Sequence, residues 1–131
     1  MKKTGILNSD ITRVISLMGH TDRIVICDAG LPIPNGVERI DLAVKAGLPS
    51  FQEVLEVVLS EMEVEKAYRA IEMEEVSPGL KEELEKTLGG IETVTISHER
   101  FKELCQEAKA VIRTGECTPY ANVILQAGVI F

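Results

Sequence analysis

The chain has 131 residues, a length typical of one domain, and 45% of them are hydrophobic although only 4% are aromatic. Its core is therefore expected to consist of aliphatic side chains, which favours a layered α/β fold with short buried strands. With 14 basic and 21 acidic residues the formal net charge is −7, which argues against binding to the phosphates of nucleic acid.

The sequence also argues against a membrane protein or a secreted one. No apolar run approaches the ~20 residues that are needed to cross a bilayer. Lys2 and Lys3 are not followed by the apolar stretch of a secretory signal. The three cysteines have no CxxC spacing, and an odd number of cysteines fits a reducing compartment. We therefore expect one cytoplasmic domain, residues 1–131, that binds neither nucleic acid nor membrane.

The first half of the chain alternates between helical and strand patterns. Asn8 or Ser9 can cap a helix whose apolar residues recur with helical spacing, and Gly19 is expected to end it in the left-handed conformation. Short aliphatic runs then predict strands at residues 24–27 and 39–44. A capping box over residues 50–53 begins a second helix, whose buried stripe is predicted at Phe51, Val54, Leu55, Val58 and Met62.

The second half continues this alternation. A strand is predicted over residues 64–73, although its two alanines leave a helix open. Pro78 begins a helix and Gly89 ends it. Regular alternation of β-branched residues predicts a strand over residues 91–96, and Ser97 can cap the helix that follows. The last strands are predicted at residues 110–112 and 123–131. The chain ends on Val129-Ile130-Phe131, and such an apolar end is more stable in an interface than in water, so we expect a large symmetric oligomer.

Two polar side chains flank the strand predicted at residues 24–27. His20 directly follows Gly19, and Asp28 ends the strand, so an imidazole and a carboxylate are available for proton transfer on a small polar substrate. Ligands of open α/β sheets bind outside the carboxyl ends of strands, which favours a role for Asp28. Two structural interpretations stay open. His20 could be a solvent-exposed residue near a helix end, and Asp28 could stabilise the following turn by bonding to its backbone.

Three further residues are candidates for substrate binding. His98 lies at the start of a predicted helix, whose N-terminus disfavours an imidazolium, so a neutral ring could bind hydroxyl groups. Tyr120 and Asn122 offer an aromatic ring, a hydroxyl and an amide, which suit the recognition of sugar hydroxyls. His98 could instead be an exposed residue of the first helical turn, and Tyr120 and Asn122 could belong to an ordinary Pro turn that leads into the last strand. The sequence has no metal-ligand cluster, no phosphate-binding loop and no hydrolase nucleophile motif, so we expect no metal and no cofactor.

From end to end, the sequence resembles the ribose/fucose mutarotase family. The matching stretches are Gly5-Ile6-Leu7-Asn8, Gly19-His20-Thr21-Asp22, Asp28-Ala29-Gly30-Leu31-Pro32, Lys109-Ala110-Val111-Ile112-Arg113-Thr114-Gly115-Glu116 and Thr118-Pro119-Tyr120-Ala121-Asn122. The resemblance implies a single-domain, three-layer α/β/α fold with a mixed central sheet. It also implies that His20 is the catalytic acid. The residues that it places around the sugar are Asp28, His98, Tyr120 and Asn122.

The resemblance further implies a homo-oligomer, commonly a decamer of two stacked pentamers, with sites between neighbouring subunits. His20 and Asp28 of one chain would then face Tyr120 and Asn122 of the next. The implied activity is interconversion of the pyranose and furanose forms of D-ribose, which feeds ribose uptake and phosphorylation. Ring opening needs a proton delivered to the ring oxygen and one removed from the anomeric hydroxyl, and one imidazole can serve both steps near neutral pH. Asp28 could hold a sugar hydroxyl or fix the tautomer of the His20 ring.

Two alternative functions remain. One is a fucose-type mutarotase, because the contacts that select among sugar hydroxyls are not visible in the sequence. The other is a non-catalytic sugar-binding partner of a ribose transporter, which would shift the ring equilibrium only at stoichiometric amounts.

Overall fold

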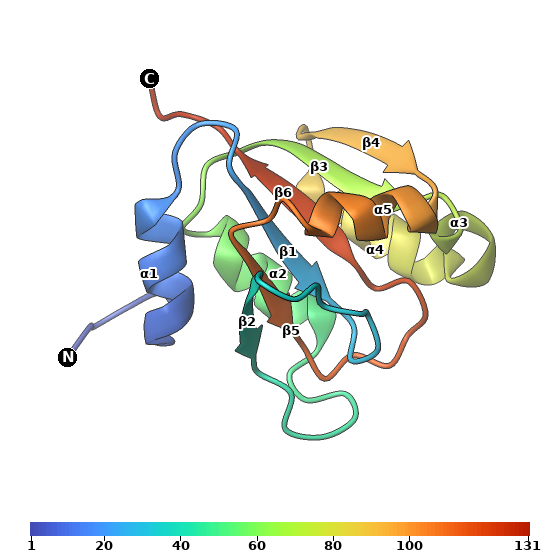
Figure 1. Ribbon diagram of the computed structural model, residues 1–131, viewed down its shortest axis with the longest axis horizontal. Helices are drawn as coiled ribbons and strands as arrows, with labels where there is room; N and C mark the ends of the chain where they lie inside the picture. Colours follow the sequence, from blue (N-terminus) through green and yellow to red (C-terminus); the bar gives the residue numbers. More distant parts are fainter.

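One mixed sheet with helices on both faces forms the structure, a computed structural model that describes residues 1–131. The strands are β1 (Arg23–Cys27), β2 (Glu38–Asp41), β3 (Val64–Ala70), β4 (Glu92–Ile96), β5 (Ala110–Arg113) and β6 (Val123–Ala127). The helices are α1 (Ser9–Leu17), α2 (Phe51–Leu59), α3 (Met73–Val76), α4 (Pro78–Leu88) and α5 (His98–Cys105). The strand order is β2-β5-β1-β6-β3-β4, and only β6 runs antiparallel to its neighbours (Figure 1).

The sheet separates two apolar clusters. Ile24 and Ile26 of β1 belong to a cluster of 22 buried residues that includes side chains of α1, α2 and α4. Val25 and Cys27, which alternate with them, belong to a cluster of nine that includes Phe101 of α5. Helix α5 covers its face alone, in front of the sheet in Figure 1. The predicted three-layer α/β/α fold with a mixed sheet is therefore confirmed. No helix in it is both long enough and apolar enough to span a membrane.

Local capping signals predicted several element boundaries correctly. The capping box of α2 is present, because Ser50 Oγ accepts from Glu53 N (3.1 Å) and the Glu53 carboxylate accepts from Ser50 N (2.8 Å). Helix α4 has Pro78 in its first turn and ends at Gly89, whose φ is 57°. The prediction for Gly19 was wrong. Helix α1 ends at Leu17, Met18 is extended, and the left-handed residue is Thr21 with a φ of 72°.

Three predicted strands are shorter in the structure, because a partner strand ends or the chain turns away. Strand β2 stops where Asp41 pairs with Arg113, the last residue of β5. Strand β3 ends at Ala70 because the chain then turns into α3. Strand β6 ends at Ala127, which pairs with Val64 at the start of β3, so residues 128–131 have no partner strand. These last residues form an extended end that leaves the sheet near the start of β1 (Figure 1).

Candidate active site

A hollow of about 300 Å³ lies at the carboxyl end of β1. Four of the predicted site residues line it: Asp28, His98, Tyr120 and Asn122. Asp28 directly follows β1, His98 is the first residue of α5, and the other two precede β6. Polar groups from three separate segments thus converge at the carboxyl end of β1. Open α/β folds bind small ligands at the carboxyl ends of their strands.

Asp28 and Asn122, which both line this hollow, are hydrogen-bonded to each other. The Asn122 side chain is only 1% exposed; its Oδ1 accepts from Asp28 N (2.9 Å) and its Nδ2 donates to Asp28 Oδ2 (3.1 Å). Asp28 Oδ1 accepts from the backbone of Gly30 and Leu31, both at 2.9 Å, so the turn-stabilising interpretation is confirmed. Because a carboxylate oxygen accepts more than one hydrogen bond, Asp28 Oδ2 can still receive a ligand hydroxyl.

His98 and Tyr120 also line the hollow. Their rings meet edge to face, with centroids 5.1 Å apart and planes at 83°. Tyr120 is left-handed (φ 64°), and its hydroxyl makes no hydrogen bond within the chain. The Nδ1 atom of His98 is buried without a partner, so Nε2 is the ring atom that can meet a ligand. The Glu72 carboxylate accepts from His98 N at 3.0 and 3.1 Å, and this bond holds the start of α5.

Sequence reasoning missed Glu72 and also missed Glu116. Glu116 accepts from the backbone of Phe51 (3.1 Å) and from Thr118 Oγ1 (2.9 Å), and its carbonyl accepts from Ala29 N (2.8 Å). It therefore ties two loops of the site to the start of α2. No sequence signal identifies such a role, because the contact with Phe51 joins residues 65 positions apart.

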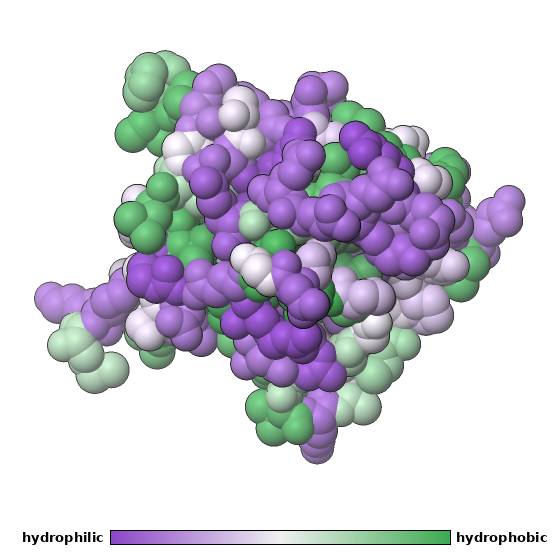
Figure 2. All heavy atoms as spheres, in the orientation of Figure 1, coloured by the Kyte–Doolittle hydropathy of each residue, from purple (hydrophilic) through white to green (hydrophobic).

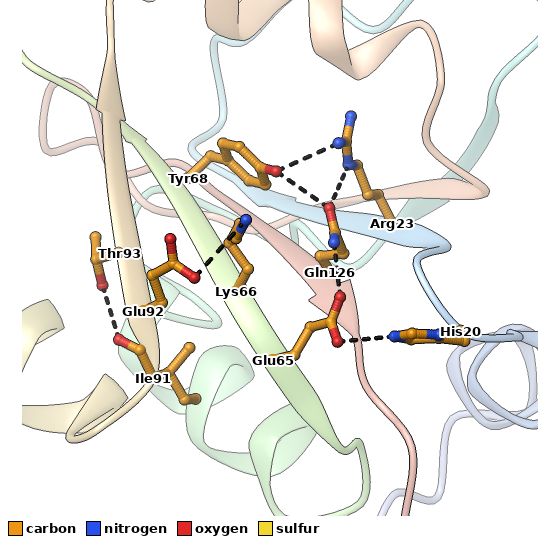
Figure 3. Close-up of polar contacts among 9 residues, drawn as sticks. All are labelled: His20, Arg23, Glu65, Lys66, Tyr68, Ile91, Glu92, Thr93 and Gln126. Carbon is orange, nitrogen blue, oxygen red and sulfur yellow. Dashed lines mark hydrogen bonds and ion pairs between the residues drawn. The ribbon is translucent and has the colours of Figure 1, made fainter.

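His20 lies at the opposite end of β1, before its first residue. It precedes β1, whereas Asp28 follows it, and five strand residues at ~3.3 Å each keep the two ends about 16 Å apart. His20 is half-exposed, and its Nε2 lies 2.8 Å from Glu65 Oε2 (Figure 3). The structure therefore does not bring His20 to the other four residues within one chain. A sequence signal for this was present, because the two residues flank one predicted strand.

Two expectations about Asp28 are therefore corrected. It does not fix the tautomer of the His20 ring in its own chain, because β1 lies between them. The division that placed Asp28 opposite Asn122 of another chain was also wrong, because these two side chains bond to each other within one chain. One hollow of the chain is lined by Asp28, His98, Tyr120 and Asn122, and His20 stands apart from it.

The Cys27 thiol, which precedes Asp28, is not available as a thiolate, and the hollow has no metal-binding cluster. Burial, followed by the neighbouring Asp28 carboxylate, raises the pKa of the Cys27 thiol to about 12, so Cys27 stays protonated at neutral pH. No three His, Cys, Asp or Glu side chains are grouped so that they could hold a metal ion. The chemistry that the described residues support is acid–base chemistry on hydroxyl groups.

Comparison with known proteins gives consistent matches over the full length. A model of the RbsD / FucU transport protein family matches residues 1–130. The D-ribose pyranases of Bacillus cereus and Symbiobacterium thermophilum are 56% and 53% identical to the chain over 131 residues, with 100% of each chain covered. The structure of Bacillus subtilis RbsD complexed with D-ribose superimposes with a TM-score of 0.97 at 53% identity, again over 100% of both chains. The FucU structure from Bifidobacterium longum shares the fold, with a TM-score of 0.78 at 23% identity over 95% of this chain and 96% of that one.

Proposed function

The chain belongs to the RbsD / FucU transport protein family, and from this premise we propose that it is an isomerase that interconverts the pyranose and furanose forms of D-ribose. The observation that carries the proposal is the full-length identity of 53–56% to proteins named D-ribose pyranase. The furanose product would be the form that is available for phosphorylation. The fucose-type alternative has weaker support, because the fucose mutarotase structure from Streptococcus pneumoniae is only 25% identical.

The chemistry follows from what ring interconversion requires. The proton of the anomeric hydroxyl (O1) must leave and the ring oxygen (O5) must gain one as the C1–O5 bond breaks. Both oxygens are attached to C1, so one imidazole can reach both in turn. Reclosure through O4 instead of O5 reverses these steps and gives the furanose. A positioned acid/base is typically worth ~10²–10⁴ in rate, and we assign that role to His20.

The hollow at the carboxyl end of β1 would hold the sugar. Asp28 Oδ2 would accept from a sugar hydroxyl, because that oxygen carries only the bond from Asn122. His98 Nε2 and the Tyr120 hydroxyl, which have no partner within the chain, would bind two further hydroxyls. Asn122 would act mainly by holding Asp28, because both polar atoms of its side chain are already bonded to that residue.

His20 would enter this site from a neighbouring subunit. Its separation from the hollow of its own chain supports this, because a heterologous contact in a ring joins two different surfaces of identical subunits. Exposed apolar side chains also support assembly. Ile130 is 90% exposed and Phe131 is 100% exposed, and both follow β6 at the end of the sheet where β1 begins, near His20. Figure 2 shows this apolar chain end, and a second apolar group at the tip of the loop after β2, which holds the exposed Val44. A decamer of two stacked pentamers is the assembly that we propose.

The test is the rate of ribose exchange, measured by NMR saturation transfer between pyranose and furanose signals. Catalytic amounts of the protein should speed this exchange, and the His20→Ala variant should lose ~10²–10⁴ of the enhancement. The substitution removes a half-exposed loop side chain, so fold and assembly should persist, as checked by circular dichroism and sedimentation. A protein that changes the spectrum only at stoichiometric amounts would be a binding partner and not an enzyme. A His20→Ala variant with the wild-type rate would remove His20 from the mechanism.

A further inference from the structure

Glu65 is the partner of His20, and nothing in the proposed reaction yet accounts for it. We propose that Glu65 is a positioning residue: its carboxylate fixes which nitrogen of the His20 ring carries the proton and how the ring is presented to the neighbouring subunit. The inference deepens the proposed function and rests on His20 being the acid/base.

An irregularity in β3 places Glu65 on the correct face of the sheet. Val64 pairs with Ala127 and Lys66 pairs with Gln126, so one extra residue stands in β3 against β6 at this point. With regular alternation counted back from the buried Ala67, Glu65 would point into the main core. The bulge instead leaves Val64 buried in that core and turns Glu65 toward the opposite face. Bulges of this kind re-aim side chains next to active sites.

A chain of hydrogen bonds then holds the carboxylate still (Figure 3). Gln126 Nε2 donates to Glu65 Oε1 (2.8 Å), and Gln126 Oε1 accepts from Arg23 Nε and from the Tyr68 hydroxyl, both at 3.1 Å. Arg23 also lies over the Tyr68 ring, 5.0 Å from its centroid. These bonds determine the orientation of the Gln126 amide, because Arg23 only donates and a carboxylate only accepts. The hydrogen bond from Gln126, and then that from His20, lower the pKa of Glu65, so it is ionised at neutral pH.

The loop that carries His20 is fixed as well. Thr21 N donates to the carbonyl of Ala127 (2.9 Å), and Gly19 N donates to Asp22 Oδ2 (2.9 Å). The backbone of Thr21, directly after His20, and the carboxylate that meets the His20 ring are therefore both tied to the end of β6. Such double anchoring restricts the imidazole to one orientation, which proton transfer at a fixed distance requires.

The consequence is an assignment of the two ring nitrogens. An ionised carboxylate only accepts, so His20 Nε2 carries the hydrogen in the bond to Glu65. Nδ1 makes no hydrogen bond within the chain and is the atom left to meet the sugar. In ring opening, Nδ1 takes the proton from O1, the electrons of that O–H bond form the C1=O1 bond, and the C1–O5 electrons move to O5. Nδ1 then returns the proton to O5, so His20 and Glu65 end unchanged. Glu65 stabilises the imidazolium that forms between these steps, as a carboxylate does behind other catalytic imidazoles.

The test compares Glu65→Ala and Glu65→Gln with a matched control, Glu92→Gln. Glu92 is also an exposed carboxylate at the same end of a neighbouring strand, but its partner is Lys66 (3.7 Å) and it does not touch His20 (Figure 3). We expect Glu65→Ala to lower the exchange rate at saturating ribose by about 10- to 100-fold, a part of the contribution of the acid/base. The dissociation constant for ribose should stay within about twofold, because Glu65 does not hold the sugar. Glu92→Gln should keep the wild-type rate.

The decisive readout is the ¹⁵N spectrum of the His20 ring, which a purely structural role would not change. Wild-type protein should show hydrogen on Nε2 and an unprotonated Nδ1. Glu65→Ala should give a mixture of tautomers, and Glu65→Gln, whose amide can donate to Nε2, should shift the hydrogen toward Nδ1.

Three results would overturn the proposal: a wild-type ring with hydrogen on Nδ1, an unchanged rate and tautomer in Glu65→Ala, or a large loss of ribose affinity, which would make Glu65 a direct ligand of the sugar. A parallel measurement on His20→Ala separates the two proposals. If that variant is inactive while Glu65→Ala is normal, only the role of Glu65 fails; if His20→Ala keeps its rate, the acid/base assignment fails first.

Discussion

A mixing experiment can decide whether the two halves of the site come from different subunits. Two variants are prepared, His20→Ala, which lacks the acid/base, and His98→Ala, which lacks one wall of the hollow. Each is expected to form an inactive homo-oligomer. They are then unfolded, mixed in equal amounts and refolded together.

The structure sets the expected size of the recovery. One hollow of one chain is lined by Asp28, His98, Tyr120 and Asn122, so a substitution at any of them damages the same hollow. His20 of that chain lies at the opposite end of β1 and serves another hollow under the proposal. In a randomly mixed ring, half of the hollows are intact and half of the adjoining His20 side chains are intact. About one quarter of the contacts then combine two intact halves, so exchange should return to about a quarter of the wild-type rate.

Two control mixtures sharpen the result. Asp28→Asn mixed with His98→Ala should stay inactive, because these residues belong to the same half and every hollow remains damaged. His20→Ala mixed with wild type should give about half of the wild-type rate under random assembly. Saturation transfer gives the rates, and mass measurement verifies that mixed oligomers have formed. An inactive mixture of His20→Ala with His98→Ala, with co-assembly verified, would refute the shared site.

Three further predictions follow from the same structure. Activity should survive extensive dialysis against a chelator, and a loss that a divalent ion restores would reveal a metal requirement. A thiol reagent at pH 8 should modify the exposed Cys117 but not Cys27 or Cys105, because burial raises the pKa of the Cys27 and Cys105 thiols to about 12. A colorimetric count of reactive thiols before and after unfolding checks this. Hydrogen bonds from Ser50 lower the pKa of Glu53 below its ordinary 4.5. The ionised carboxylate therefore stabilises α2 above pH 4.5, and this contribution is lost as the pH falls through the lower pKa of the folded state. The difference in urea-unfolding stability between wild type and Glu53→Gln should therefore shrink between pH 6 and pH 3.

The helices and strands could largely be predicted from the sequence, because the signals that define them act over a few residues. The capping box at Ser50, Pro78 in the first turn of α4 and Gly89 at its end all perform the predicted roles. Alternation predicted β4, and aliphatic runs predicted β1 and β5. Motifs along the chain also identified the residues of the hollow, since a polar side chain just beyond a strand lies at the edge of the sheet.

Only the tertiary structure decided how these pieces meet. Asp28 and Asn122 are 94 positions apart, and they bond because β6 runs antiparallel beside β1 and begins where β1 ends. Glu65 reaches His20 because of a shift of register between β3 and β6, which depends on a partner strand some 60 residues further along the chain. Hydrogen-bond register between distant strands is set by the packing of the whole sheet, and no periodicity within one segment encodes it. For this reason the sequence identified which residues could act on a sugar, whereas the fold placed His20 and Asp28 at opposite ends of β1.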